Sequence, residues 1–276
     1  MPVDPNVLGT EFEPYELDYD ETDTIIYALG VGAGRDPEEL DYVYERDLLA
    51  LPSQPVVAVS RIFMAMTGVL NISGKARVHG EQRLVLHRPP PSRGRMRVEA
   101  RVTGVWDKGS GAVVDVETPL SVDGELLATA TFSSFVRGGG GFGGERGSGL
   151  EKPALEEPPA LVVEDEMSWN QALIYRLTGD LNPLHIDPEY AAASGFEEPI
   201  MHGLCTYGFA VRMAMKGLGW LRPHQIGEVN ARFVSPVYAG QRLRLELWPR
   251  EGDRVIARLL AGDAVAIDPL ELVLRD

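Results

Sequence analysis

The chain has 276 residues, with 26 lysines and arginines against 41 aspartates and glutamates, five histidines and one cysteine. A formal net charge of −15 disfavours nucleic acid and anionic lipid as partners, and a lone thiol excludes an internal disulfide. Because no apolar run reaches the length of a membrane span and the first residues do not resemble a signal peptide, we expect a cytoplasmic protein without a membrane partner.

The first half predicts one helix followed by antiparallel strands. Residues 56–70 form an apolar stretch that we interpret as the helix. Alternation of apolar and polar residues then predicts strands over 83–88, 95–102, 112–117 and 126–136, with a proline-to-glycine turn over 89–94.

A glycine-rich stretch over 138–149, followed by an acidic segment with prolines to residue 159, interrupts the pattern. Glycine loses the most conformational freedom when it becomes ordered, so such a run is typical of a linker. The alternative is a long surface loop within one domain. We predict an N-terminal domain over 1–137, a linker over 138–165 and a C-terminal domain over 166–276.

The second half repeats the order of the first. A helix with few charges is expected over 204–218, and strands over 228–234, 241–247, 255–260 and 270–274. A helix that is apolar nearly all round is a buried one. Two copies of a buried helix followed by antiparallel strands predict an α+β fold in which each sheet wraps around its helix.

Chemistry-bearing residues concentrate between the linker and the second predicted helix. A short helix over 169–177, which Ser168 is placed to cap, is followed by a proline-stiffened loop with Asp180, Asn182 and His185. A carboxylate and an imidazole on one stiff loop suit general acid–base catalysis, and Asn182 can fix a substrate amide or carbonyl. The alternative is that Asp180 caps, Asn182 turns the chain and His185 is a buried structural residue.

Gly203 lies at the start of the second predicted helix, directly after His202. Backbone N–H groups at a helix start are unpaired and lie at the positive end of the helix dipole, so they can stabilise negative charge on a carbonyl oxygen. The alternative is that Gly203 only relieves a tight packing contact.

These segments carry a resemblance to a known family. Residues 175–191 and 195–209 closely resemble the hydratase 2 signature of (R)-specific 2-enoyl-CoA hydratases, which belong to the MaoC-like group and include the hydratase part of the peroxisomal type 2 multifunctional enzyme. Residues 27–33, 78–82, 107–111 and 138–144 are also similar to the first half of that family.

The resemblance implies a double hotdog fold with one working catalytic site. Within it, Asp180 and His185 match the catalytic pair, Asn182 the accompanying asparagine and Gly203 the backbone donor to the oxyanion. Glu45 matches a functionally important glutamate of the first half, although the residues after it depart from the small ones expected there. The first half lacks a catalytic pair of its own, so it is expected to shape an acyl tunnel.

The substrate implied by the family is an acyl-CoA thioester, which carries phosphates. A basic cluster in the first half is a candidate binding site for these phosphates. The alternative is that its members are ordinary outward-facing charges on strands. Its members are Lys75, Arg77, Arg83, Arg88, Arg93, Arg95, Arg97 and Arg101. The candidate substrate and CoA contacts are Arg83, Arg88, Arg232, His79 and His202.

No further cofactor and no metal are expected, because the histidines lack ligand-like spacing and there is no second thiol. The family resemblance favours a homodimer. The expected reaction is hydration of trans-2-enoyl-CoA to (3R)-hydroxyacyl-CoA and the reverse dehydration. The alternatives are a 3-hydroxyacyl-ACP dehydratase, a hydratase for an unusual polyketide or sterol side chain, a hotdog thioesterase and a catalytically silent acyl-CoA-binding subunit.

Overall fold

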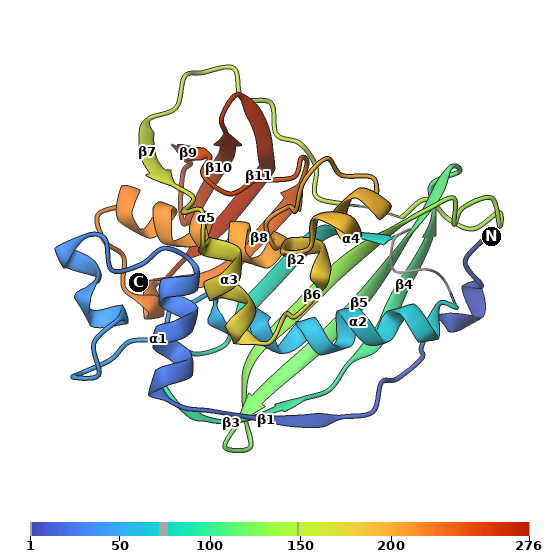
Figure 1. Cartoon of the computed structure of the whole chain (residues 1–276), viewed down its shortest axis with the longest axis horizontal. Helices are drawn as coiled ribbons and strands as arrows, with labels where there is room; N and C mark the ends of the chain where they lie inside the picture. Colours follow the sequence, from blue (N-terminus) through green and yellow to red (C-terminus); the bar gives the residue numbers. More distant parts are fainter. Residues whose placement is uncertain (1, 72–76, 148, 276) are drawn as a thin grey trace.

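The computed structural model describes residues 2–71, 77–147 and 149–275, so Lys75 of the basic cluster lies outside the described residues. The described strands form one antiparallel sheet (Figure 1). The strands are β1 (Tyr15–Tyr19), β2 (Arg77–Leu86), β3 (Gly94–Val98), β4 (Arg101–Asp107), β5 (Gly111–Val122), β6 (Glu125–Arg137), β7 (Leu161–Glu166), β8 (Ile226–Phe233), β9 (Arg242–Pro249), β10 (Arg254–Ala261) and β11 (Ala264–Leu274).

The sheet consists of two similar halves joined edge to edge. The first half has the order β1-β3-β5-β6-β2, with β4 pairing with β5, and the second has the order β8-β11-β10-β9-β7. The halves meet where β2 pairs with β8, with Glu81 opposite Arg232 and Val85 opposite Glu228. Side chains of β5 and β10 alternate between buried and partly exposed, which is the pattern of a sheet covered on one face.

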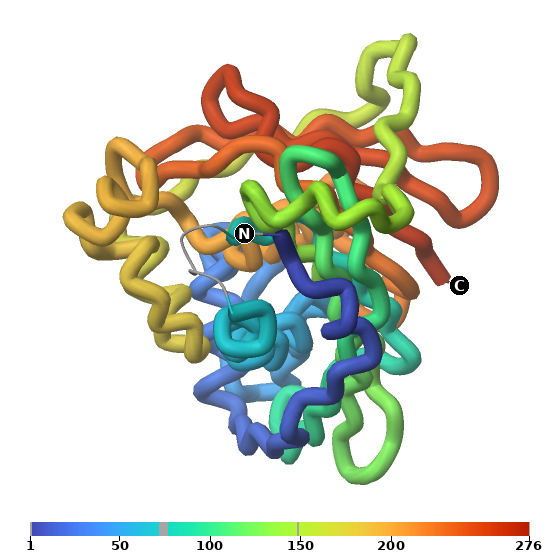
Figure 2. Tube along the Cα trace, turned by 90° about the vertical axis from the view of Figure 1, so that its right-hand side faces the viewer, coloured from blue at the N-terminus to red at the C-terminus, as the bar shows by residue number. Residues whose placement is uncertain are grey.

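Helices gather on one face of this sheet (Figures 1 and 2). The α-helices are α1 (Glu21–Gly30), α2 (Val59–Val69), α3 (Gln171–Tyr175), α4 (Pro188–Ala193) and α5 (Gly203–Gly217). Short 3-10 helices are η1 (Pro5–Val7), η2 (Pro37–Tyr42), η3 (Gln54–Ala58), η5 (Arg176–Thr178), η6 (Pro183–His185) and η7 (Pro223–Gln225). None of the helices in the described ranges is long and apolar enough to cross a membrane. The predicted α+β class is confirmed.

The two central helices differ in how much of their surface is buried. In α5 every residue from Leu204 to Met215 is buried, as the apolar sequence predicts. In α2 only Val59, Ile62 and Met66 are buried, and Met64 is half exposed. The expectation of a fully buried first helix was therefore wrong, because one side of α2 faces a cavity that the sequence pattern does not reveal.

The glycine-rich stretch packs against the first half of the chain through backbone hydrogen bonds. The backbone N–H groups of Gly141 and Gly143 donate to the Asp107 carboxylate at 2.9 and 2.7 Å, and Gly109 donates to it at 2.8 Å. A Cβ at Gly140 would meet the carbonyl oxygen of Gly111 at 2.2 Å, so only glycine fits there. At the other end of the predicted linker, residues 161–165 belong to β7, which pairs with β9.

Candidate active site

A cavity of about 280 Å³ lies where the two halves of the sheet meet. From the first half it is lined by one side of α2, the start of β2 and the end of β6, including Phe63, Arg77 and His79. From the second half it is lined by the loop with Asp180, by α4, and by the start of α5. Both halves therefore contribute to one site.

The loop from Gly179 to His185 is held by its own side chains. Asp180 Oδ1 accepts from the backbone N–H of Asn182 at 3.2 Å, and Asn182 Oδ1 accepts from the N–H of Leu184 at 3.1 Å. Pro183 then starts η6, which carries His185. These local bonds satisfy backbone donors that a helix start leaves open, and they place Asp180, Asn182 and His185 on the wall of one cavity.

His185 has a defined tautomer. Its Nδ1 lies 2.8 Å from the carbonyl oxygen of Ile200, and a carbonyl can only accept, so Nδ1 carries the hydrogen and Nε2 carries a lone pair. Burial lowers the pKa of His185, while the nearby Asp180 and the Ile200 carbonyl act in the opposite direction. The ring is therefore neutral at neutral pH and can take up a proton at Nε2.

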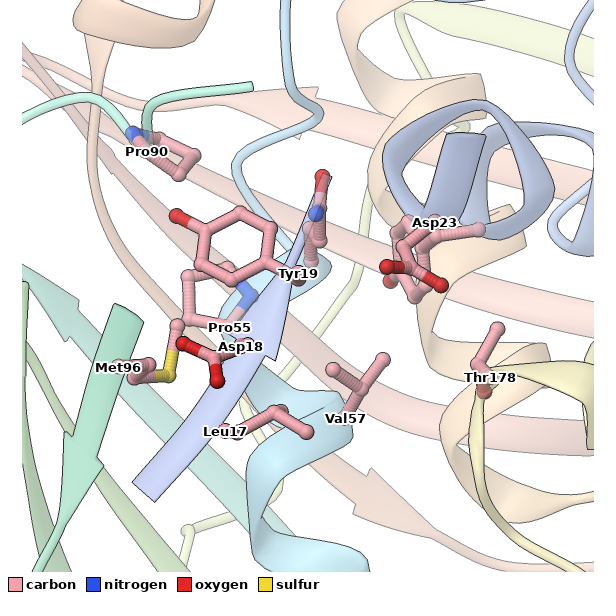
Figure 3. A pocket seen from close by; sticks show the side chains of 11 residues that line it. Leu17, Asp18, Tyr19, Asp23, Pro55, Val57, Pro90, Met96 and Thr178 are labelled. Atoms are coloured by element: carbon pink, nitrogen blue, oxygen red, sulfur yellow. The ribbon is translucent and has the colours of Figure 1, made fainter. Parts of the chain in front are cut away.

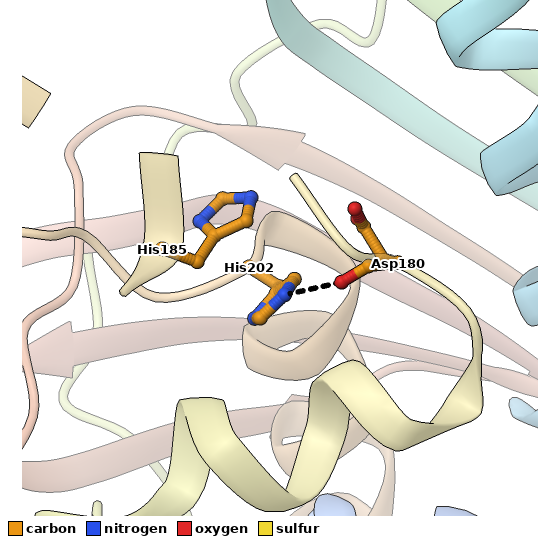
Figure 4. A group of neighbouring side chains, drawn as sticks. All are labelled: Asp180, His185 and His202. Carbon is orange, nitrogen blue, oxygen red and sulfur yellow. Dashed lines mark hydrogen bonds between the residues drawn. The ribbon is translucent and has the colours of Figure 1, made fainter. Parts of the chain in front are cut away.

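His202 contacts both Asp180 and His185. Its Nε2 lies 3.1 Å from the backbone carbonyl oxygen of Asp180, and its ring lies against that of His185 with 3.8 Å between centroids (Figure 4). Only 1% of its surface is exposed, and burial, with His185 beside it, lowers the pKa of His202 to about 2. His202 is not among the residues that line the cavity, so the structure places it as a support for the loop and not as a substrate contact.

Asp180, His185 and His202 each offer one ligand-type atom within 4.8 Å of the others, which makes them the group of described residues that could approach a metal ion. The two imidazole rings lie with 3.8 Å between centroids and are tilted by 31° relative to each other. One nitrogen of each ring already donates to a backbone carbonyl oxygen: His185 Nδ1 to that of Ile200 and His202 Nε2 to that of Asp180. The arrangement suits proton transfer better than coordination.

Gly203 is the first residue of α5 and lines the cavity. A Cβ added there would meet only the Phe233 ring, at 3.7 Å, which is an ordinary contact. Protein packing therefore does not require glycine at this position. A methyl group at this position would instead occupy cavity space beside the unpaired N–H groups of the helix start. A substrate carbonyl can approach the backbone through that space.

Several predicted substrate contacts lie elsewhere. Glu45 is exposed in a loop and does not line the cavity. Arg83 pairs with Glu81 at 3.2 Å, Arg88 donates to the carbonyl oxygen of Val122 at 2.7 Å, and Arg232 Nε donates to that of Asp268 at 2.9 Å. None of these four predicted residues lines the cavity. The arginines are held by a carboxylate of the same strand or by backbone carbonyls elsewhere in the sheet.

His79 does line the cavity, but as part of an aromatic wall. Its ring lies 5.3 Å from Phe63 and 5.0 Å from Phe233, measured between centroids. Removal from water lowers the pKa of His79 to about 4, so it stays neutral at neutral pH. Phe63 and Phe233 were not singled out from the sequence, since alternation places them on elements without showing which side faces a cavity.

A second, smaller cavity of about 70 Å³ lies beside β1 and α1 (Figure 3). Its carboxylates are already engaged: Asp18 accepts from Arg95 at 2.6 Å, and Asp23 accepts from the backbone N–H of Asp20 as part of the cap of α1. This cavity offers little volume and no uncommitted acid–base pair. A third cavity, of about 390 Å³ beside η2, has more volume, but its buried Glu39 is paired with Arg212. The cavity lined by Asp180 and His185 is therefore the candidate active site.

Comparison with known proteins agrees with both halves of the chain. The domain described as the MFE-2 hydratase 2 N-terminal domain matches residues 17–138, and the MaoC like domain matches residues 151–263. Enoyl-CoA hydratase ChsH3 of Mycobacterium tuberculosis is 38% identical over 99% of each chain. Mouse peroxisomal multifunctional enzyme type 2 is 40% identical over 90% of this chain, which spans only 35% of that protein.

Solved structures show the same architecture. The MaoC-like dehydratase from Phytophthora capsici superposes with a TM-score of 0.88 at 27% identity and covers 100% of this chain and 98% of its own. A conserved protein of Mycobacterium tuberculosis with a double hotdog fold has a TM-score of 0.62 at 13% identity, covering 97% of this chain and 96% of its own. The double hotdog prediction is confirmed.

Proposed function

Because the chain belongs to the MaoC-like hydratase 2 family, we propose that it catalyses the (R)-specific hydration of trans-2-enoyl-CoA and the reverse dehydration. The observation that carries this proposal is the convergence of three groups on one cavity: the Asp180 carboxylate, the free Nε2 of His185 and the backbone at Gly203. Each supplies a different requirement of water addition to an unsaturated thioester.

In this proposal the thioester carbonyl oxygen accepts a hydrogen bond from the Gly203 N–H. That bond draws electrons from the C2=C3 double bond and stabilises the enolate-like charge of the transition state. A Cβ at this position would lie in the space that the carbonyl needs, and the open surroundings of Gly203 support this role.

Asp180 and His185 hold the attacking water between them. One O–H bond of the water breaks, its oxygen forms a bond to C3, the π electrons move to C2, and a proton is delivered to C2. The two residues act as one coupled acid–base pair, in which His185 Nε2 is the available acceptor. With the water held by this pair, it adds to one face of the alkene, and the resemblance to the (R)-specific hydratases supports a (3R) product.

The test mixes the protein with a short trans-2-enoyl-CoA and follows the loss of conjugated enoyl absorbance. The product is then offered to (R)- and (S)-specific 3-hydroxyacyl-CoA dehydrogenases. Oxidation by the (R)-specific enzyme alone is the expected result. An (S) product or release of free CoA without hydration contradicts the proposal. The same assay with an acyl-carrier-protein thioester distinguishes a dehydratase that prefers that carrier.

The wider organisation is part of the same proposal. We infer that the first half contributes the acyl side of the cavity through α2 and β2, whereas the catalytic groups come from the second half. A homodimer in the cytoplasm is the expected working form. Light scattering in solution tests the dimer, and a monomer would contradict it; microscopy of the tagged protein in its own cells tests the location.

A further inference from the structure

The cavity continues away from the catalytic pair to a buried arginine. The Phe233 ring lies beside Gly203, His79 packs against Phe233, and Phe63 stacks on His79. The guanidinium carbon of Arg77 then lies 3.9 Å from the centroid of the Phe63 ring. Aromatic side chains therefore line the cavity between the predicted position of the thioester carbonyl and Arg77.

Among the residues that the structure describes, Arg77 has no anionic partner, although only 7% of its surface is exposed. Its Nη2 donates to the Thr67 hydroxyl at 3.4 Å, but Nε and Nη1 have no acceptor among the described residues. Other arginines of the basic cluster differ in this respect: Arg83, Arg93, Arg95 and Arg97 form ion pairs with glutamates or aspartates. Burying a charge without a counter-ion costs free energy. An anionic group of a bound ligand would supply the counter-ion that Arg77 lacks.

The charges that line the cavity are segregated. Among the described lining residues only Asp180, Arg77 and Arg137 are charged. Arg137 is the last residue of β6 and follows Val136, which lies opposite Arg77 across the strand pair. Burial lowers the pKa of Arg77 to about 10, which leaves it cationic at neutral pH. The end of the cavity around Arg77 is therefore positive, and no described carboxylate lines it.

We propose that Arg77, assisted by Arg137, binds a carboxylate at the far end of the acyl chain, so that the enzyme favours enoyl-CoA thioesters of dicarboxylic acids. This inference rests on the proposed hydratase function and specifies its substrate class. The apolar stretch between Gly203 and Arg77, with Val59, Phe63 and Met64 on its wall, suits methylene groups. The open donors of Arg77 then meet the terminal carboxylate.

The phosphates of CoA are the other anions that could reach this arginine. They carry a bulky nucleotide and are joined to the thioester by the long, polar pantetheine arm. Arg77 is buried in an apolar part of the cavity, which fits a terminal carboxylate on an acyl chain better than such a group. The experiment below separates the two sources of negative charge.

The test compares two trans-2-enoyl-CoA substrates of equal chain length, one ending in a methyl group and one in a carboxylate. The wild-type protein should show the higher kcat/KM with the carboxylate substrate. Arg77→Met should lower the ratio of carboxylate to methyl kcat/KM by about tenfold or more, which is the usual worth of a hydrogen bond to a charged group. Arg83→Met is the matched control and should leave the ratio unchanged, because Arg83 is paired with Glu81 away from the cavity.

Arg77→Lys, which keeps the charge, should retain most of the preference and serves if the methionine variant does not fold. A ratio unaffected by Arg77→Met overturns the inference, and so does an equal loss with both substrates, which would place Arg77 on CoA. Calorimetric binding of the two matching saturated acyl-CoA thioesters gives the same ratio without turnover. If the wild-type protein hydrates neither substrate, the proposed function fails, while the binding ratio still decides the role of Arg77.

Discussion

The Nδ1–H group of His185 donates to the carbonyl oxygen of Ile200 over 2.8 Å, and this single bond sets the chemistry of the whole ring. It leaves the lone pair on Nε2, in the cavity that Asp180 also lines. The His202 ring lies 3.8 Å from the His185 ring between centroids and donates to the backbone carbonyl oxygen of Asp180, so it links the positions of Asp180 and His185.

The pH dependence of the rate follows from this arrangement. In the proposed mechanism hydration needs the lone pair on His185 Nε2, so protonation of the ring should abolish activity. Burial lowers the folded-state pKa of His185 below its ordinary value near 6.5, and the ring therefore stays neutral to lower pH than a free histidine. We expect the acidic limb of the kcat/KM profile to have its midpoint below pH 6.5. A midpoint at or above 6.5, with the protein still folded by circular dichroism, would contradict the assigned environment.

Gly203→Ala should remove activity without harming the fold. The added methyl group meets only the Phe233 ring at 3.7 Å, and alanine is the better helix former, so thermal stability should not fall. In the proposed mechanism the same methyl group would occupy the space through which the thioester carbonyl approaches the backbone. We therefore expect kcat/KM to fall by about 100-fold or more, as for other losses of oxyanion stabilisation. Steady-state kinetics and a melting curve on the same preparation give both quantities.

Gly208→Ala is the control from the same helix. A Cβ there would lie 2.4 Å from Val31 Cγ1 and 2.9 Å from the Tyr27 hydroxyl, in a fully packed region. This variant should lose stability, by about 1–3 kcal/mol for an overpacked core site. If Gly203→Ala also melted earlier and kept its activity, the position would be structural, and the backbone donor would have to be sought elsewhere.

The halves of the chain are also joined by a buried ion network. Arg212 of α5 forms ion pairs with Glu39 and Asp165, and its Nε donates to the carbonyl oxygen of Val31 at 2.9 Å. Arg212 is 5% exposed at its side chain and Glu39 is 1% exposed. Arg212→Met leaves the Glu39 carboxylate buried without its cation, which should cost about 3–5 kcal/mol of unfolding free energy in a denaturant titration.

A second variant separates the ion network from simple packing. Adding Glu39→Leu to Arg212→Met removes the stranded carboxylate, so the double variant should recover part of the lost stability. If the double variant were as unstable as the sum of the two single variants, the cost would arise from the packing of the arginine and not from its charge.

Asp107 should hold the glycine-rich stretch in place. Three backbone donors from Gly109, Gly141 and Gly143 converge on its carboxylate and lower the pKa of Asp107 to about 2. Because the folded-state pKa is depressed, this contribution to stability is present above the ordinary value near 3.8 and is lost as pH falls through about 2.

Asp107→Asn keeps one oxygen and loses the charge, so it should increase protease cleavage between residues 138 and 149 at neutral pH. Asp253→Asn, a change of the same kind in a surface turn, is a suitable control. Equal cleavage of the Asp107 variant and the wild-type protein would show that the carboxylate does not hold the segment.

Much of the architecture could be predicted from local sequence patterns. Alternation identified most of the strands, and the nearly uniform apolar character of residues 204–215 predicted the buried α5. It did not predict β1 or β7, and the strand predicted over 95–102 is divided between β3 and the start of β4. The burial of α2 could not be predicted in the same way, because Phe63 and Met64 face a cavity, and an apolar side chain looks the same in sequence whether it lines a core or a ligand site.

Only part of the candidate site could likewise be predicted from the sequence. Asp180, Asn182, His185 and Gly203 lie within one short segment, so the sequence indicated that they could meet. Arg83 and Arg88 were expected to contact CoA, but their partners lie on neighbouring residues and strands whose pairing is a tertiary property. Arg77 belonged to the same cluster, and its difference from the others becomes visible only when its missing counter-ion and its place in the cavity are known.

The most direct test of the catalytic assignment is the hydration rate of Asp180→Asn. Asparagine keeps the Oδ1 that accepts from the Asn182 N–H at 3.2 Å, so the loop and the melting temperature should be preserved. The negative charge that the proposed mechanism pairs with His185 is lost, and kcat should fall by about 10²–10⁴-fold. A folded variant with that loss is the result we predict. A folded variant that hydrates trans-2-enoyl-CoA at nearly the wild-type rate would contradict the Asp180–His185 mechanism.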